Sequence, residues 1–128
     1  MITEDYVSFE TAKLLKEKGF NEDSWFHYDA DGDVVTRGYR LNMPEDVPAW
    51  TLQMAMKWLR EKHHLHIEIR ITNHSMSDMV NIVKYYWVMT NTETGRWCDE
   101  STVYTVKGFD KSEEAEEDAI RNALENLI

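Results

Sequence analysis

Three histidines, His63, His64 and His66, lie close together in the chain and are the first candidates for chemistry. Imidazole nitrogens bind zinc, but a zinc site needs three or four ligands within reach of one ion. The only cysteine, Cys98, lies far along the chain. Histidine is also favoured at the C-terminal end of a helix by the helix dipole. The pattern therefore favours a structural role, and we expect no bound metal at these residues.

The segment Asp29-Ala30-Asp31-Gly32-Asp33 contains alternating aspartates, as the start of a calcium-binding loop does. An EF-hand loop would require glycine at its sixth position and glutamate at its twelfth. Val34 and Arg40 occupy those positions here. Aspartate and glycine are also the residues that favour tight turns. We therefore expect a polar hairpin turn rather than a calcium site.

Cys98 is the strongest candidate nucleophile, and its neighbours argue against that role. Asp99 and Glu100 follow it directly, and nearby carboxylates raise the pKa of a thiol instead of lowering it. The five glycines are scattered and form no phosphate-binding loop. We expect no catalytic residue and no cofactor, and the hypothesis for this chain is a non-enzymatic one.

Aromatic residues are unusually abundant, with five tryptophans and six tyrosines. Most of them should lie in the core, because aromatic side chains dominate core burial. A minority could line an interaction surface, where tryptophan and tyrosine are enriched. The candidates for this surface are Trp25, Tyr28, Tyr39, Trp50, Tyr86 and Trp97.

Length and charge limit the possible partners. A chain of 128 residues with 42% hydrophobic residues fits a single domain, 1–128, with its own core. The net charge of −10 is uneven: about −6 over residues 1–48, +1 over 49–108 and −5 over 109–128. This distribution disfavours nucleic acids and anionic membranes and leaves a basic protein open as partner. No run approaches the roughly 18 apolar residues of a membrane helix, and the single cysteine fits a cytoplasmic location.

The first part of the chain, residues 1–48, predicts a helix and a hairpin. Ser8 is a suitable N-cap, and Gly19 is a suitable C-terminal stop for a short amphipathic helix. Residues 25–28 and 34–41 are typical of two strands joined by the polar turn. Residues 42–48 are expected to form a loop.

The second part, residues 51–128, predicts the order α-β-β-β-α. A helix begins near Thr51, and strands are expected at 65–72, at 82–90, and at Trp97 followed by 102–106. A last helix should be capped by Asp110 or Ser112. The fold class is therefore α+β, with an antiparallel sheet and helices on one face. The apolar face of the first of these strands should pack against the helices; its members are Leu65, Ile67, Ile69 and Ile71, and its expected contacts are Leu59, Ala119, Ile120, Ala123 and Leu124.

Three segments carry a resemblance: YVSFETAKLLKEKGF, AMKWLREKHHLHIEI and EEAEEDAIRNALENLI. Together they resemble a group of small proteins encoded by phages and prophages of Bacteroides and its relatives. The resemblance implies a bacterial cytoplasm and a phage or prophage origin, and it implies no activity, cofactor or site residue.

The order of elements over residues 51–128 also resembles the double-stranded-RNA-binding domain. That domain begins its closing helix with lysines that bind phosphates, whereas residues 110–118 here hold six acidic residues and one lysine. We therefore expect no binding of double-stranded RNA. The leading hypothesis is a protein that acts by protein–protein contact, with a phage-encoded modulator of a host protein as one version. The alternative is a nucleic-acid-associated domain that has lost its basic clamp, and the sequence leaves the oligomeric state open.

Overall fold

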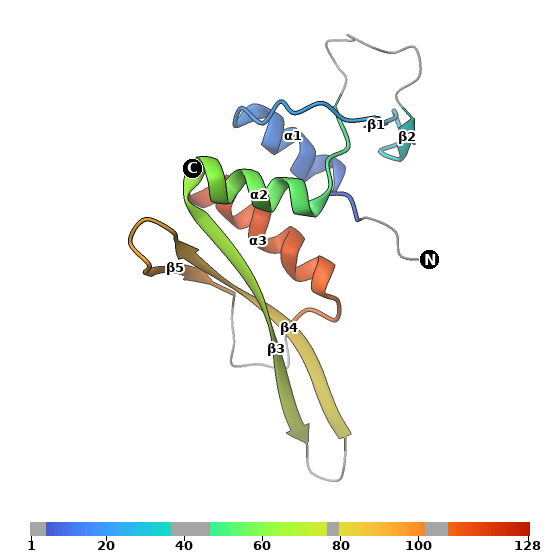
Figure 1. The fold of residues 1–128 in the computed structure, drawn as a ribbon. Helices are drawn as coiled ribbons and strands as arrows, with labels where there is room; N and C mark the ends of the chain where they lie inside the picture. The colour runs from blue at the N-terminus through green and yellow to red at the C-terminus, as the bar shows by residue number, and fades with distance from the viewer. Residues whose placement is uncertain (1–4, 37–46, 77–79, 102–107) are drawn as a thin grey trace.

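The computed structural model describes residues 5–36, 47–76, 80–101 and 108–128, and it shows an α+β fold (Figure 1). Its elements are α1 (Phe9–Glu17), β1 (Phe26–Tyr28), β2 (Val34–Thr36), α2 (Leu52–His63), β3 (Leu65–Met76), β4 (Val80–Asn91), β5 (Trp97–Glu100) and α3 (Ser112–Asn126). The predicted order α-β-β-β-α after residue 51 is confirmed. The expected strand continuations at 37–41 and 102–106, and Tyr39 with them, lie outside the described residues.

Helices α1 and α2 begin and end as the sequence predicts. The Ser8 hydroxyl accepts a hydrogen bond from the Thr11 amide at 3.2 Å, and the Thr51 hydroxyl accepts one from the Met54 amide at 3.1 Å. Each bond satisfies an amide that has no partner within the helix. Gly19 ends α1 with a φ of 98°, a left-handed conformation that costs glycine little. His64 takes a similar conformation at the end of α2.

The start of α3 differs from the prediction. Its N-cap is Lys111, whose side chain makes no capping hydrogen bond. Asp110 is not the cap because its carboxylate pairs with the ammonium group of Lys84 on β4. Ser112 is already the first residue of the helix. Asp110, which the sequence predicts as a helix cap, therefore connects the start of α3 to the sheet instead.

The main sheet is antiparallel with the order β3-β4-β5. β3 and β4 form a continuous ladder from Leu65 opposite Asn91 to Met76 opposite Val80. Between β4 and β5 the register shifts by one residue, so that Thr90 faces Trp97 and Met89 faces Asp99. β1 and β2 form a separate two-stranded sheet. The hairpin of the first part thus stands apart from the three-stranded sheet.

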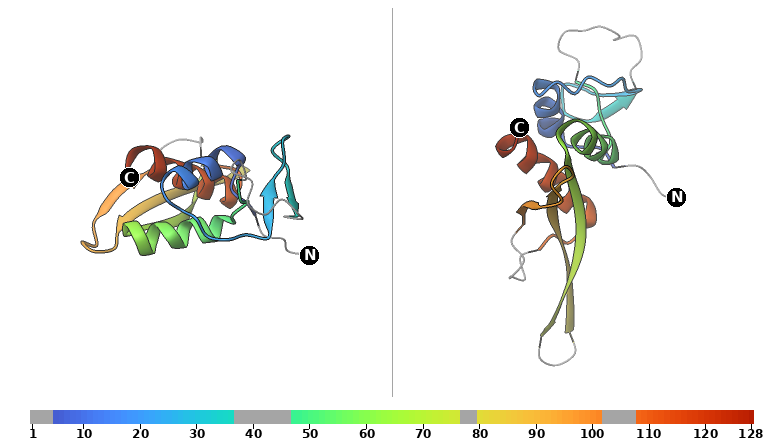
Figure 2. Two further views of the ribbon diagram at one scale, coloured as in Figure 1. Left: turned by 90° about the horizontal axis from the view of Figure 1, so that it is seen from above. Right: turned by 60° about the vertical axis from the view of Figure 1, so that its left-hand side comes forward.

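Helices α2 and α3 pack against one face of the main sheet, and α1 packs against α3 (Figure 2). One core joins residues from the two parts of the chain. Its large, fully buried members include Leu15, Trp50, Leu59, Met89, Ile120 and Leu124. The β3–β4 hairpin, called the ribbon below, extends beyond the helices (Figure 1 and the right-hand view of Figure 2).

The predicted burial of the apolar face of β3 holds for only part of the strand. Leu65 and Ile67 are buried, and Ile69 packs against the core while partly exposed. Ile71 is 62% exposed, so its predicted contact with the helices is wrong. Alternation of apolar residues determines which face of a strand they occupy. It does not determine how far along the strand a helix covers that face.

Two residues of β4 test this boundary of the core. Met89 is fully buried beneath the helices, whereas Val83 lies on the same face farther out and is 48% exposed. We expect Met89→Ala to lower the free energy of unfolding by about 2–5 kcal/mol, because it leaves a cavity. Val83→Ala should lower it by less than about 1 kcal/mol, because little burial is lost. Urea unfolding of both variants would measure this, and equal losses would contradict the boundary.

Candidate functional site

The three clustered histidines point to different surroundings. The imidazole of His63 lies against the ring of Trp58, with 4.7 Å between centroids. Burial, together with the charges of Lys62 and His64, lowers the pKa of His63. His64 Nε2 lies 3.2 Å from a carboxylate oxygen of Glu93 in the β4–β5 turn. His66 is exposed on β3. The structure therefore does not bring the three imidazoles together around one point.

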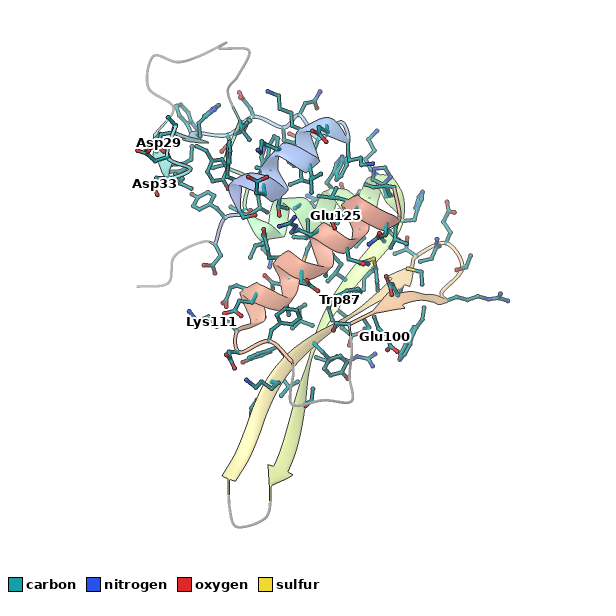
Figure 3. The ribbon with its side chains drawn as sticks, turned by 180° about the vertical axis from the view of Figure 1, so that it is seen from behind. Asp29, Asp33, Trp87, Glu100, Lys111 and Glu125 are labelled. Carbon is teal, nitrogen blue, oxygen red and sulfur yellow. The ribbon has the colours of Figure 1, made fainter. Side chains whose placement is uncertain are left out.

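The aspartate-rich segment forms the turn between β1 and β2. Asp29 Oδ1 accepts hydrogen bonds from the amides of Asp31 and Asp33, each at 2.9 Å. Carboxylate oxygens of all three aspartates lie within 4.8 Å of one another. The labels in Figure 3 place Asp29 and Asp33 at the edge of the molecule. The predicted polar hairpin turn is confirmed, and its carboxylate hydrogen bonds stabilise the turn.

Cys98 is the extra residue where the β4–β5 register shifts, which makes it a β-bulge. Its thiol donates a hydrogen bond to the Met89 carbonyl at 3.5 Å. Burial and the negative charge of Asp99 raise the pKa of the thiol. A thiol held protonated is a poor nucleophile, so the geometry offers no support for catalysis by Cys98.

The aromatic residues predicted to form an interaction surface do not form one surface. Trp50 is fully buried, and its indole nitrogen donates to the Glu22 carbonyl at 2.8 Å. Tyr28 is also buried, and its hydroxyl donates to the Val7 carbonyl. Both residues are core residues, which corrects the prediction for them. Trp25 is 79% exposed beside β1.

Tyr86 and Trp97 lie on the same face of the main sheet, the face opposite α2 and α3. The Arg70 guanidinium lies 5.4 Å from the centre of the Trp97 ring and also makes two hydrogen bonds with Glu68, at 3.1 and 3.2 Å. Tyr86 lies directly across from Arg70 in the ladder. Because the bulge at Cys98 changes the parity of β5, Trp97 shares this face while Asp99 points to α3 and accepts from Asn122 at 2.6 Å.

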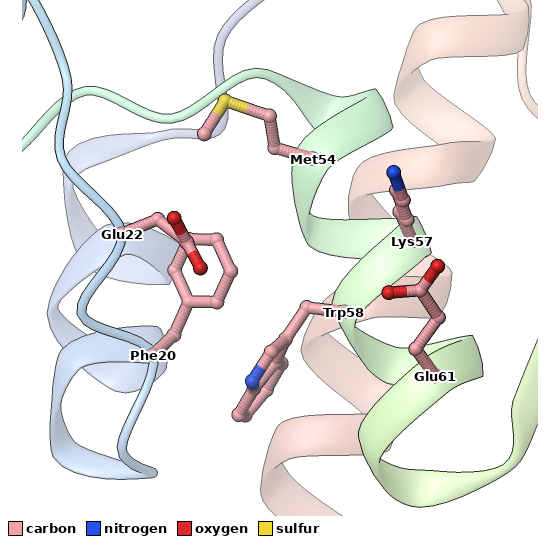
Figure 4. Close-up of a pocket in the computed structure, with 6 residues that line it drawn as sticks. All are labelled: Phe20, Glu22, Met54, Lys57, Trp58 and Glu61. Carbon is pink, nitrogen blue, oxygen red and sulfur yellow. The ribbon is translucent and has the colours of Figure 1, made fainter.

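A small cavity lies between α2 and the segment that follows α1. Its volume is about 290 Å³, and Phe20, Met54 and Trp58 form its apolar wall. The rings of Phe20 and Trp58 meet edge to face at 5.2 Å (Figure 4). Its charged lining residues are Glu22, Lys57 and Glu61. These lining residues include no hydroxyl, thiol or imidazole.

A larger, shallow depression of about 430 Å³ lies along the first half of α3, and we call it the acidic groove. The apolar part of its lining is Tyr6, Leu52 and Phe109. Its carboxylates are Asp5, Glu113, Glu114, Glu117 and Asp118. Its one basic residue is Arg121, which makes an ion pair with Glu125 at 3.1 Å. Five carboxylates therefore share a groove with one cation that is already paired.

Three segments distant in sequence build this groove. Residues 5–8 are held against the start of α2, where the Val7 amide donates to the Trp50 carbonyl and the Leu52 amide donates to the Asp5 carbonyl. Phe109 exchanges two backbone hydrogen bonds with Tyr85 of β4, both at 2.8 Å. Figure 3 shows α3 itself between its labelled residues Lys111 and Glu125. The groove is thus fixed by backbone contacts on both sides of the helix.

Two of the groove carboxylates also hold the fold together. Glu117 Oε1 accepts from the Thr11 hydroxyl at 2.6 Å and from the Ser8 amide at 3.0 Å, which fixes α1 to α3. Asp118 Oδ2 accepts from the Trp87 indole nitrogen at 2.8 Å, which fixes α3 to the sheet. Glu113 and Glu114 are exposed in the first turn of α3. These two glutamates and the exposed Asp5 are therefore accessible to a partner.

The carboxylates near the groove contribute to a raised pKa at the neighbouring Glu116. The pKa of Glu116 is raised by partial burial first, and then by the charges of Glu113 and Asp5. Like charges disfavour each other's ionised forms. A cation bound here would relieve this repulsion.

The sequence identified the acidity of α3 but not the groove. Tyr6, Leu52 and Phe109 come from three separate segments, and no local pattern places them beside the same helix. The predicted interaction residues likewise omitted Tyr6. A signal was present in the distribution of charge, because residues 109–128 carry an acidic excess that the dipole of α3 does not require along its whole length.

Among the described residues, no helix is both long and apolar enough to cross a membrane. Comparisons with protein-family models, with curated proteins and with solved structures found no match to this chain.

The raised pKa of Glu116 predicts a pH-dependent cost in stability. Because the folded chain holds this proton more tightly than the unfolded chain, ionisation of Glu116 destabilises the fold above the raised pKa. That cost disappears as the pH falls through the raised pKa toward the ordinary value. We expect Glu116→Gln to melt at a higher temperature than the wild type at neutral pH, with a difference that shrinks toward about pH 4.

Glu114→Gln is the matched control, because Glu114 is exposed in the first turn of the same helix. Its neutralisation should remove a small favourable interaction with the helix dipole and should not raise the melting temperature. A lower melting temperature for Glu116→Gln at neutral pH would contradict the prediction.

Proposed function

We propose that this protein is a non-enzymatic binding protein that acts by protein–protein contact, and that the acidic groove holds a basic, amphipathic segment of its partner. The observation that carries the proposal is the groove itself, where five carboxylates surround an apolar lining beside α3. The raised pKa of the Cys98 thiol and the separate surroundings of His63 and His64 are in keeping with a non-enzymatic role.

Charge in the groove selects the chemistry of the partner. All five carboxylates lie along one depression, so their fields add at distances within the Debye length of about 8 Å at physiological salt. Lysine or arginine side chains would be attracted to this region. Arginine fits best, because its planar group binds carboxylates through two hydrogen bonds.

The apolar lining adds a second requirement. Tyr6 and Phe109 are partly buried and pack against the core, so their rings are held in place before any partner binds. Rigid aromatic side chains lose little entropy on binding and are common at interface centres. A segment that combines basic residues with an apolar residue therefore matches the groove better than a purely basic one.

The origin of the protein and its location in the cell are also part of the proposal. A modulator of a host protein, encoded by a phage or prophage and active in the bacterial cytoplasm, would need only a binding surface of this kind. The single cysteine, which is a free thiol, is compatible with a reducing compartment.

One observation favours the alternative class, a nucleic-acid-associated domain. The order α2-β3-β4-β5-α3 matches the element order of the double-stranded-RNA-binding domain. The charge at the start of α3 opposes it, because Glu113 and Glu114 are exposed where phosphate-binding cations would be required. Fold alone does not imply function, and we therefore rank this alternative second.

A labelled peptide of alternating arginine and leucine tests the proposed groove. We expect it to bind the wild type, and we expect the double variant Glu113→Lys, Glu114→Lys to bind at least about tenfold more weakly, since two attractive charges become repulsive. Fluorescence anisotropy measures both affinities, and a peptide of arginine and serine should bind more weakly than the arginine–leucine peptide.

The matched control changes the net charge by the same amount at another place on the surface. Asp31→Lys, Asp33→Lys alters two exposed aspartates in the β1–β2 turn, away from the groove. This control should change the affinity by less than about twofold. Equal losses in the two double variants would show that the peptide responds to net charge alone and would overturn the groove as the binding site.

Duplex RNA provides the test of the alternative class. We expect no binding at micromolar protein and about 0.15 M salt, because the dipole of α3 supplies only about half a positive charge against its neighbouring carboxylates. An anisotropy titration with a labelled RNA duplex measures this. Saturable binding that weakens steeply with salt would contradict the inference from charge and would favour the nucleic-acid function.

A further inference from the structure

The outer edge of β3 is a long row of backbone groups without a partner strand among the described residues. β3 lies at the edge of the β3-β4-β5 sheet and is paired only with β4. It spans 12 residues, about twice the usual length of a strand. An edge strand exposes amide and carbonyl groups that can pair with another strand.

Of the features that normally prevent such pairing, this edge has charged side chains, at Glu68 and Arg70, and no proline, lysine or bulge. Proteins protect their edges with prolines, lysines, bulges or charges that point inward. β3 contains no proline and no lysine, and its ladder with β4 shows no register shift. The residues on its inner face from position 65 to 71 are all leucine or isoleucine. The edge is therefore suited to accept a strand.

We propose that the partner strand is β3 of a second copy of this chain, paired antiparallel and centred on Ile69. This register places each Glu68 opposite Arg70 of the second copy, and each Arg70 opposite its Glu68. On the other face it places Ile67 opposite Ile71 of the second copy, and the two Ile69 residues opposite each other. Directly opposed side chains have Cβ atoms about 4.5–5.5 Å apart, close enough for both kinds of contact.

Other registers satisfy fewer of these contacts. A centre on Glu68 or on Arg70 would oppose like charges across the two-fold axis, which is destabilising. A centre between two residues would place apolar side chains opposite polar ones, because side chains alternate between the faces. Centres on Ile67 or Ile71 lose both Glu68–Arg70 pairs between the copies, and each Arg70 keeps only its bonds to Glu68 of its own chain. The charges and the apolar face therefore agree on one register.

Backbone geometry permits this register. When the two-fold axis passes through a residue, odd-numbered residues pair with odd-numbered ones and even-numbered residues with even-numbered ones. The amide and carbonyl groups that point away from β4 in one copy therefore face the equivalent groups of the other copy. The result is a continuous antiparallel sheet of six strands. Its interface is isologous and closed, as in most soluble dimers.

The shape of the molecule leaves space for the second copy. The two-fold axis stands perpendicular to the sheet, so both helical layers lie on the same face. In the single chain the helices cover one end of the ribbon and leave its other end bare (Figure 1). Because the paired strands are antiparallel, the helices of each copy would stand beside the bare part of the other copy's ribbon. Ile71, which is 62% exposed in the single chain, then lies next to Ile67 of the second copy, a residue buried beneath helices.

Charge reversal tests both the pairing and its register. Sedimentation equilibrium of the wild type should show a dimer at micromolar concentration. Glu68→Arg and Arg70→Glu should each weaken self-association at least about tenfold, because the symmetry makes every reversal act twice. An equimolar mixture of the two variants should form a heterodimer, and the double variant E68R/R70E should regain the homodimer.

The recovery in the mixture separates the proposal from a loss of folding, since both single variants keep their own backbone and core. Thermal melts of each variant provide the direct check. A wild type that stays monomeric at all concentrations tested would overturn the proposal. Single variants that dimerise like the wild type would overturn the pairing, and a mixture that does not recover would overturn the register.

Discussion

Helix α3 packs against the sheet and against both other helices, and the small side chains on its inner face allow this close approach. Ala115, Ala119 and Ala123 are fully buried, and they alternate with the larger Ile120 and Leu124 along the same stripe. Alanine lets a helix lie near its neighbours without loss of helix propensity. Contacts of α3 with β3, β4, α1 and α2 follow from this one surface. The main sheet and helices α1 and α2 are therefore positioned relative to α3.

The close packing of the inner face of α3 also determines where the side chains of its other faces point. Once the inner stripe is fixed, Glu117 and Asp118 must point to α1 and to Trp87, where their carboxylates accept hydrogen bonds. Charge-assisted hydrogen bonds of this kind are stronger than neutral ones. Glu113 and Glu114 line the groove instead, and Glu125 pairs with Arg121. Acidity that stabilises the helix start through its dipole thus also produces the local repulsion at Glu116.

Sequence patterns predicted the elements better than their surroundings. The helix cap at Ser8, the helix start near Thr51 and the stop at Gly19 were predictable because each depends on residues a few positions apart. The burial of Trp50 and Tyr28 was not, because their indole and hydroxyl groups find carbonyl partners at Glu22 and Val7, far away in sequence. The same limit explains Asp110, whose partner Lys84 lies on β4. Distant polar partners decide whether an aromatic or acidic residue lies in the core, at a cap or on the surface.

The bare end of the ribbon follows from element lengths. The 15 residues of α3 span about 22 Å at 1.5 Å per residue, whereas the 12 residues of β3 span about 40 Å at 3.3 Å per residue. No placement of one such helix covers the whole strand. Apolar alternation nevertheless continues to Ile71, beyond the covered part. This exposed continuation of the apolar face, beyond the reach of the helices of the same chain, is the physical basis of the proposed pairing along β3.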